Sequence, residues 1–215
     1  MLGRFALIAF SLALGLGCKK TESNPLTTPD LPKAAITAAA PPLVPAAADA
    51  KEYVIDQAAS RIAFVGSNVT TTQEGKFESF SGAVKVKGTD PTSASASVKI
   101  VMDSLKVGPD GLNKHLRSPD FFDVAKYPEA SFETTSIKPG GERGATHTVE
   151  GNLELRGTKK SVRFPANIVV TDQTAKLDAK FLLDRQAFGV AYTGKADNLV
   201  RDVVTVDLAL VASPK

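Results

Sequence analysis

The sequence predicts an all-β domain, an antiparallel sandwich or barrel of about eight short strands. Apolar and polar residues alternate with a period of two from Tyr53 almost to the end of the chain, as in strands with one buried face. Breaks containing Gly, Asp or Pro separate the alternating runs, as at residues 88–91 and 138–141. A closed barrel is favoured because it removes the exposed edges that an open sheet would carry.

The composition excludes several classes of chemistry. The chain has 215 residues, 26 Lys and Arg against 23 Asp and Glu (net charge +3), one cysteine and two histidines. A single cysteine rules out an intramolecular disulfide, a CxxC redox pair and a thiolate zinc cluster. No run of Lys or Arg resembles the phosphate-tracking stripe of a nucleic-acid-binding protein. We therefore expect no metal site and no nucleic-acid partner.

Residues 1–17 are typical of a lipoprotein-type signal peptide. Arg4 precedes an apolar run that ends at Leu16 and is too short to span a bilayer, and Cys18 follows. The arrangement resembles a lipobox with its aliphatic residue displaced, and a plain secretory signal with an incidental cysteine is the alternative. Both interpretations predict export to the periplasm. A lipidated Cys18 predicts a membrane anchor, and Lys19 after it favours the outer membrane.

Residues 18–52 are rich in Ala, Pro and Thr and contain no aromatic residue. Such a segment cannot bury enough apolar surface to offset the entropy of ordering it. We expect a disordered tether that holds a folded domain, residues 53–215, away from the membrane.

The folded part contains several alternating runs in succession. In each run one face is apolar and the other is polar, so each predicts a strand with its apolar face toward a common interior. The runs lie at residues 61–64, 95–102, 149–156, 161–170, 176–183 and 203–210.

Short helical segments are predicted near residues 110–126. Leu112 and Leu116 are four residues apart, as in a helical turn, and the Ser-Pro-Asp sequence that follows is typical of a helix start. Phe121 and Phe122 would then pack inward or cover a barrel mouth.

Five segments, in order, resemble the YceI-like family of bacterial periplasmic polyisoprenoid-binding proteins. The signature segment is NKHLRSPDFFDVAKYPEASFE at residues 113–133, and together the segments cover about residues 53–211. The chain departs from the family where Ala59 precedes Ser60 and Gly66-Ser67-Asn68 ends the run, so the histidines of many members are not carried over. The other four segments are YVIDQAASRIAF, KFESFSGAV, VEGNLELRGTKKSV and LDRQAFGVAY.

The resemblance implies an eight-stranded, lipocalin-like antiparallel β-barrel with an elongated apolar interior. It also implies binding of an amphiphile with an isoprenoid tail, an isoprenoid quinone or polyprenyl lipid, with no cofactor and no established catalysis. The alternating apolar residues either line such a cavity or simply fill a core. The predicted lining set is Ile62, Phe64, Val98, Ile100, Phe121, Phe122, Leu153, Leu155, Phe164, Ile168, Phe181 and Leu183.

Two polar residues are candidate contacts for the head group of the lipid. His115 is a head-group donor, a general base or a structural polar residue on a short helix. Arg185 reaches an anionic head group or pairs with a carboxylate inside the domain, with Asp202 in the same network.

Three hypotheses for function follow. The first is non-catalytic binding, for transport or sequestration of an isoprenoid lipid or quinone in the cell envelope. The second is an enzyme that acts on such a lipid through His115 with Asp120 or Asp123. The third is a stress-protection or interaction lipoprotein whose barrel is filled by its own side chains. The sequence also leaves open whether the protein forms a homodimer.

Overall fold

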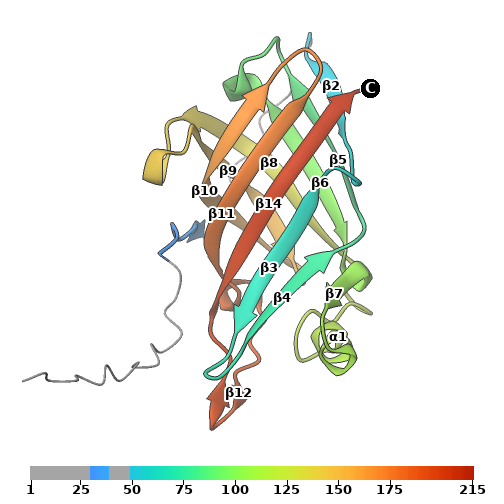
Figure 1. Ribbon diagram of the computed structural model, residues 1–215, viewed down its shortest axis with the longest axis vertical. Helices are drawn as coiled ribbons and strands as arrows, with labels where there is room; N and C mark the ends of the chain where they lie inside the picture. The colour runs from blue at the N-terminus through green and yellow to red at the C-terminus, as the bar shows by residue number, and fades with distance from the viewer. Residues whose placement is uncertain (1–29, 39–48) are drawn as a thin grey trace, which may run out of the picture.

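The computed structural model describes residues 30–38 and 49–215, so the predicted signal peptide, residues 1–17, and Cys18 lie outside the described residues (Figure 1). The barrel wall is formed by β2 (Lys51–Ile55), β3 (Arg61–Ser67), β4 (Thr72–Phe77), β5 (Phe80–Val86), β6 (Ser95–Val101), β7 (Leu105–Val107), β8 (Glu129–Pro139), β9 (His147–Leu155), β10 (Thr158–Val170), β11 (Ala175–Asp184) and β14 (Val203–Pro214). The shorter elements are β1 (Ala35–Thr37), η1 (Pro91–Ser93), η2 (Met102–Ser104), α1 (Asp110–Arg117), η3 (Glu142–Gly144), η4 (Gln186–Phe188), β12 (Gly194–Lys195) and β13 (Asn198–Leu199).

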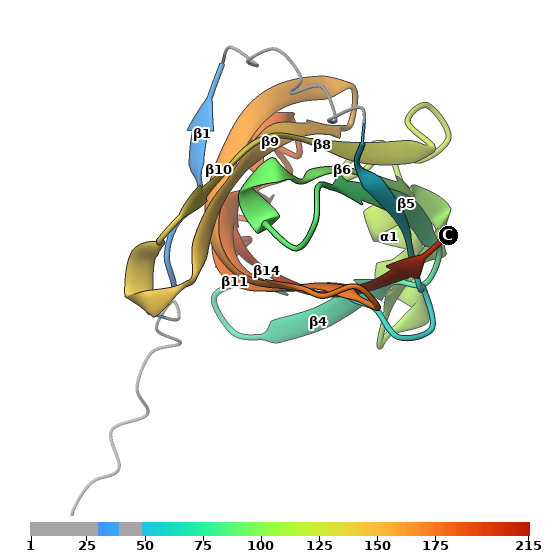
Figure 2. The same ribbon diagram turned by 90° about the horizontal axis from the view of Figure 1, so that it is seen from above.

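The strands close into a barrel in which each neighbour is antiparallel to the next. The order around the wall is β2-β5-β6-β8-β9-β10-β11-β14, and β14 pairs again with β2. Figure 2 looks down this ring, and no sheet edge remains between β14 and β2. The predicted eight-stranded antiparallel barrel is confirmed.

Three short connections, residues 56–60, 78–79 and 102–104, join β2 to β3, β4 to β5 and β6 to β7. Side-chain hydrogen bonds tie these connections to the rest of the wall. The N–H of Val211 donates to Ser60 Oγ at 2.9 Å, and the side-chain amide of Gln57 donates to the carbonyl of Glu78 at 2.9 Å. After these connections, β3 pairs with β14 and with β4, and β7 pairs with β4. The helix α1 packs beside β7.

The predicted helix near residue 112 is confirmed as α1. The side chain of Asn113 accepts from the N–H of Val107 at 2.8 Å and donates to its carbonyl at 2.9 Å, which ties the helix to β7. Leu116 is buried in a cluster with Leu105 and Phe121. The helix therefore covers the barrel end with its apolar face.

The second helical start, predicted at residues 118–120, is wrong, because residues 118–122 form turns. The Ser118 hydroxyl donates backward to the carbonyl of His115 at 2.8 Å and is not used as a forward helix cap. Asp123 has a φ of 50°, in the left-handed region that a right-handed helix excludes.

Part of the predicted tether is folded, which corrects the expectation that all of residues 18–52 lack regular structure. The strand β1 pairs antiparallel with residues 161–163 of β10, and β2 begins at Lys51. At the start of this segment Asp30 pairs with Arg143, whose hydrogen bond and charge lower the pKa of Asp30. Composition could not reveal this, because the segment is ordered by backbone hydrogen bonds to a strand edge.

Candidate ligand-binding cavity

The barrel encloses an apolar cavity of about 350 Å³, within the range of roughly 300–1,000 Å³ that is typical of small-molecule sites. It runs along most of the barrel, because its lining residues come from every strand from β2 to β11 and from β14. The third hypothesis required a barrel filled by the protein's own side chains. The cavity shows that the interior is not filled in this way.

All twelve residues of the predicted lining set lie at the wall of this cavity. The strand register explains the outcome, because directly paired residues point to the same face of a sheet. Phe64 and Phe181, for example, both pair with Val206, and all three line the cavity. Whether these side chains contact a lipid stays a prediction.

The structure adds lining residues that the predicted set left out. On β14 they are Val204, Val206, Leu208 and Leu210, which lie on the inward face of the last alternating run. The same alternation was visible in the sequence and could have included them.

Two glycines let large aromatic rings lie flat against the wall. An ideal Cβ added to Gly75 would lie 2.3 Å from the ring of Phe64, and one added to Gly151 would lie 2.3 Å from the ring of Phe132. The rings thus occupy the space over these glycines. Any side chain at either position would push a phenyl ring toward the cavity.

A few polar residues line the cavity beside the β3–β4 turn. They are Ser67 at the end of β3, Asn68 and Thr71 in the β3–β4 turn, and Gln73 in β4. Gln73 pairs with Gly66 of β3. An ideal Cβ added to Gly66 would have no atom within 4 Å. The space over Gly66, next to Gln73 on the neighbouring strand, is therefore open. The sequence signal was the polar stretch after residue 65, which departs from the family pattern.

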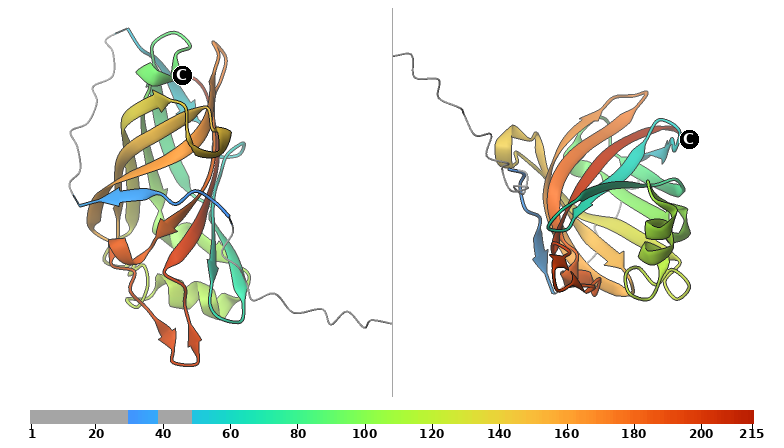
Figure 3. Two further views of the ribbon diagram at one scale, coloured as in Figure 1. Left: turned by 90° about the vertical axis from the view of Figure 1, so that its left-hand side faces the viewer. Right: turned by 60° about the horizontal axis from the view of Figure 1, so that its bottom comes forward.

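The segment around α1 covers part of one end of the barrel (Figure 3). Leu112 and Leu116 of α1 line the cavity together with Phe121 and Phe122 from the turns that follow. The expectation that the two phenylalanines pack inward agrees with this placement.

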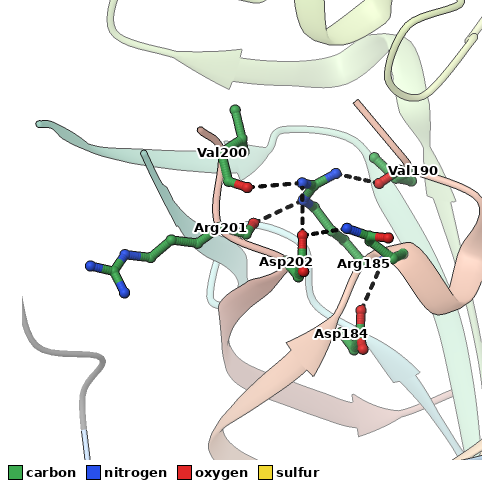
Figure 4. Close-up of polar contacts among 7 residues, drawn as sticks. Asp184, Arg185, Val190, Val200, Arg201 and Asp202 are labelled. Carbon is green, nitrogen blue, oxygen red and sulfur yellow. Dashed lines mark hydrogen bonds and ion pairs between the residues drawn. The ribbon is translucent and has the colours of Figure 1, made fainter. Parts of the chain in front are cut away.

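Arg185 lies at the cavity wall with its guanidinium enclosed by backbone carbonyls (Figure 4). It donates to the carbonyl of Arg201 at 2.9 Å, to that of Val200 at 3.2 Å and to that of Val190. Its side chain is only 5% exposed, and the predicted ion pair with Asp202 is present at 3.4 Å. Burial lowers the pKa of Arg185 below its ordinary value, and the charge of Asp202 opposes that shift.

His115 lies beside the cavity and is not one of its lining residues. Its Nε2 is 3.3 Å from a carboxylate oxygen of Asp120, and its side chain is 36% exposed. The rings of Phe121 and Tyr192 meet the imidazole edge to face, with centroids 5.1 and 4.8 Å away. This environment is that of a packed structural residue at the surface.

Within residues 30–38 and 49–215, no group of three or more His, Cys, Asp or Glu side chains could hold a metal ion. In the same part of the chain no helix is long and apolar enough to cross a membrane.

A closed antiparallel barrel around an apolar cavity defines a ligand-binding barrel of the lipocalin-like class. The chain belongs to the YceI-like domain family, whose model matches residues 53–212. It is 35% identical to a UPF0312 protein of Shewanella sp. (strain ANA-3) over 130 residues, which are 59% of this chain and 67% of that protein.

Two solved structures share the fold. BcnA of Burkholderia cenocepacia is 30% identical, with a TM-score of 0.65, over 74% of this chain and 99% of that one. A polyisoprenoid binding domain from Saccharophagus degradans is 19% identical, with a TM-score of 0.61, over 76% of this chain and 98% of that one. The fold and the family predicted from the sequence are both confirmed.

Proposed function

We propose that this protein binds an isoprenoid lipid or quinone in the cell envelope and transports or sequesters it without catalysis. The cavity carries the proposal: its wall is apolar along most of its length, with a few polar residues beside the β3–β4 turn. Each 100 Å² of apolar tail removed from water contributes about 2.5 kcal/mol, so a tail is held without directed polar contacts. The structural neighbour described as polyisoprenoid-binding supports this choice of ligand.

The two head-group candidates differ in their support. Arg185 reaches the cavity wall, but its donors already serve the carbonyls of Val190, Val200 and Arg201. His115 is not a lining residue. We therefore place the head group beside the β3–β4 turn, where Gln73 pairs with Gly66 and the space over Gly66 is open.

Titration of the delipidated protein tests the proposal. Calorimetry with geranylgeraniol and with decylubiquinone is expected to give saturable binding at a single site. The same quinone ring without its tail is the matched control and should bind far more weakly, because the apolar contact is lost. No saturable binding of either tailed probe would contradict the proposal.

His115→Ala distinguishes binding from catalysis. Because the side chain is partly exposed and outside the cavity lining, the substitution should change ligand affinity by no more than about twofold. Mass spectrometry of the bound lipid, incubated with the wild-type protein and with the variant, should show the same unmodified molecule. A lipid product that forms only with the wild-type protein would favour the enzyme alternative.

For location we propose export to the periplasm and anchoring through Cys18, most simply at the outer membrane. The support is the sequence of residues 1–19 alone. Incorporation of labelled palmitate into the full chain, and none into a Cys18→Ser variant, is the expected result, and equal labelling would contradict it.

A further inference from the structure

One seam of the barrel wall is only partly closed by its own two strands. The strands β10 and β11 pair directly only where residues 167–170 face residues 175–178. Beyond that point, residues 158–166 of β10 pair with β9, and β11 continues along β14 to Asp184. We call the stretch without direct pairing the β10–β11 seam.

Residues 32–37 lie in this seam, with backbone pairs to both strands, and we call them the strap. On one side Ala35, Ile36 and Thr37 pair with residues 161–163 of β10. On the other side the N–H of Ala34 donates to the carbonyl of Leu182 at 2.8 Å, and the N–H of Leu182 donates to the carbonyl of Pro32 at 2.9 Å. The strap thus bridges both strands, and Figure 3 shows β1 lying against this part of the wall.

Behind the strap the seam is closed by side chains. Ile36 pairs with Val162 and packs against the cluster that holds Ala34, Phe164 and Phe181. The rings of Phe164 and Phe181 stack across the seam with centroids 4.4 Å apart. Val162, Phe164 and Phe181 all line the cavity. A gap at this place would therefore lead directly to the ligand space.

We propose that the strap is a detachable gate over a side entrance to the cavity, through which an apolar ligand enters between β10 and β11. The inference rests on the proposed binding function. The strap holds β10 by only three register pairs, whereas the neighbouring β11–β14 seam has ten. Its buried or half-buried apolar side chains are Pro32, Ala34 and Ile36. Segments with few buried apolar contacts open first in a native protein.

A disulfide lock tests the gate. Ala35 pairs directly with Arg163, and both side chains are exposed on the outer face. Cα atoms of antiparallel partners are about 4.5–5.5 Å apart, within the range that a disulfide spans. The variant Ala35→Cys/Arg163→Cys, in the full chain with Cys18→Ser, is oxidised and mixed with the neutral apolar dye N-phenyl-1-naphthylamine.

The oxidised variant should take up the dye at least tenfold more slowly than its reduced form, with an unchanged equilibrium affinity. The matched control is Asp178→Cys/Ala209→Cys, a lock of the same kind across the continuously paired β11–β14 seam, which should leave uptake unchanged. Equal uptake by the locked and the reduced strap overturns the gate and leaves the binding function intact. Failure of the reduced protein to bind the dye at all overturns both.

Hydrogen exchange on the unmodified full chain gives a second measurement that needs no variant. The amides of Ala34 and Leu182, which make the bridging hydrogen bonds, should exchange at least tenfold faster than the amides of β14 between residues 204 and 210. Equal protection at both places would overturn the gate.

Discussion

Val206→Trp is expected to weaken the binding of decylubiquinone at least tenfold. Val206 points into the cavity and pairs with Phe64 on one side and Phe181 on the other. A large side chain there occupies the ligand space. Overpacking a full core costs about 1–3 kcal/mol, and the open space beside Val206 should keep the loss of stability at the lower end of that range.

The control is Ala209→Trp, which places the same side chain on β14 but on the outward face, opposite Arg61 and Asp178. It should leave affinity unchanged within about twofold. Calorimetric titration of both variants gives the comparison. Equal affinities in the two variants would show that the ligand site lies elsewhere.

Arg185→Ala is expected to reduce the free energy of unfolding by about 3–5 kcal/mol, because three backbone carbonyls lose their donor at a cost of about 1–3 kcal/mol each. The substitution leaves the carbonyl of Val190, which is buried, and those of Val200 and Arg201, which are partly buried, without this donor. At about 2–4 °C per kcal/mol for a domain of this size, the midpoint of thermal unfolding should fall by roughly 10 °C. Scanning calorimetry measures both quantities.

Asp202→Asn separates the ion pair from the carbonyl contacts. The Asp202 side chain is 56% exposed, so its charge should contribute no more than about 1 kcal/mol. If this variant were as unstable as Arg185→Ala, the ion pair rather than the carbonyl contacts would hold the guanidinium.

The lining of the barrel could be predicted because it depends on a local rule. Alternation places Phe64 and Leu153 on the inward face whatever the strand order is. The presence of a cavity could not be predicted in the same way, because it depends on which residues meet across strands. Gly75 and Gly151 make room for Phe64 and Phe132 only once the register is known.

The features that were missed depend on contacts between distant segments. The strap is ordered by Leu182 and by residues 161–163, more than a hundred residues along the chain, and composition carries no trace of that pairing. The three carbonyls around Arg185 come from residues 190–201, whose path is set by the fold and not by a motif. The prediction of a second helix after α1 was wrong at a segment where Asp123 has a left-handed φ, which the sequence does not reveal.

Organic extraction and mass spectrometry of the protein, purified from a host that makes quinones, test the central claim most directly. The account predicts a stoichiometric amount of an isoprenoid lipid or quinone in the wild-type extract and a strongly reduced amount in Val206→Trp. A wild-type barrel that is isolated empty, and that stays empty after mixing with such lipids, would contradict it.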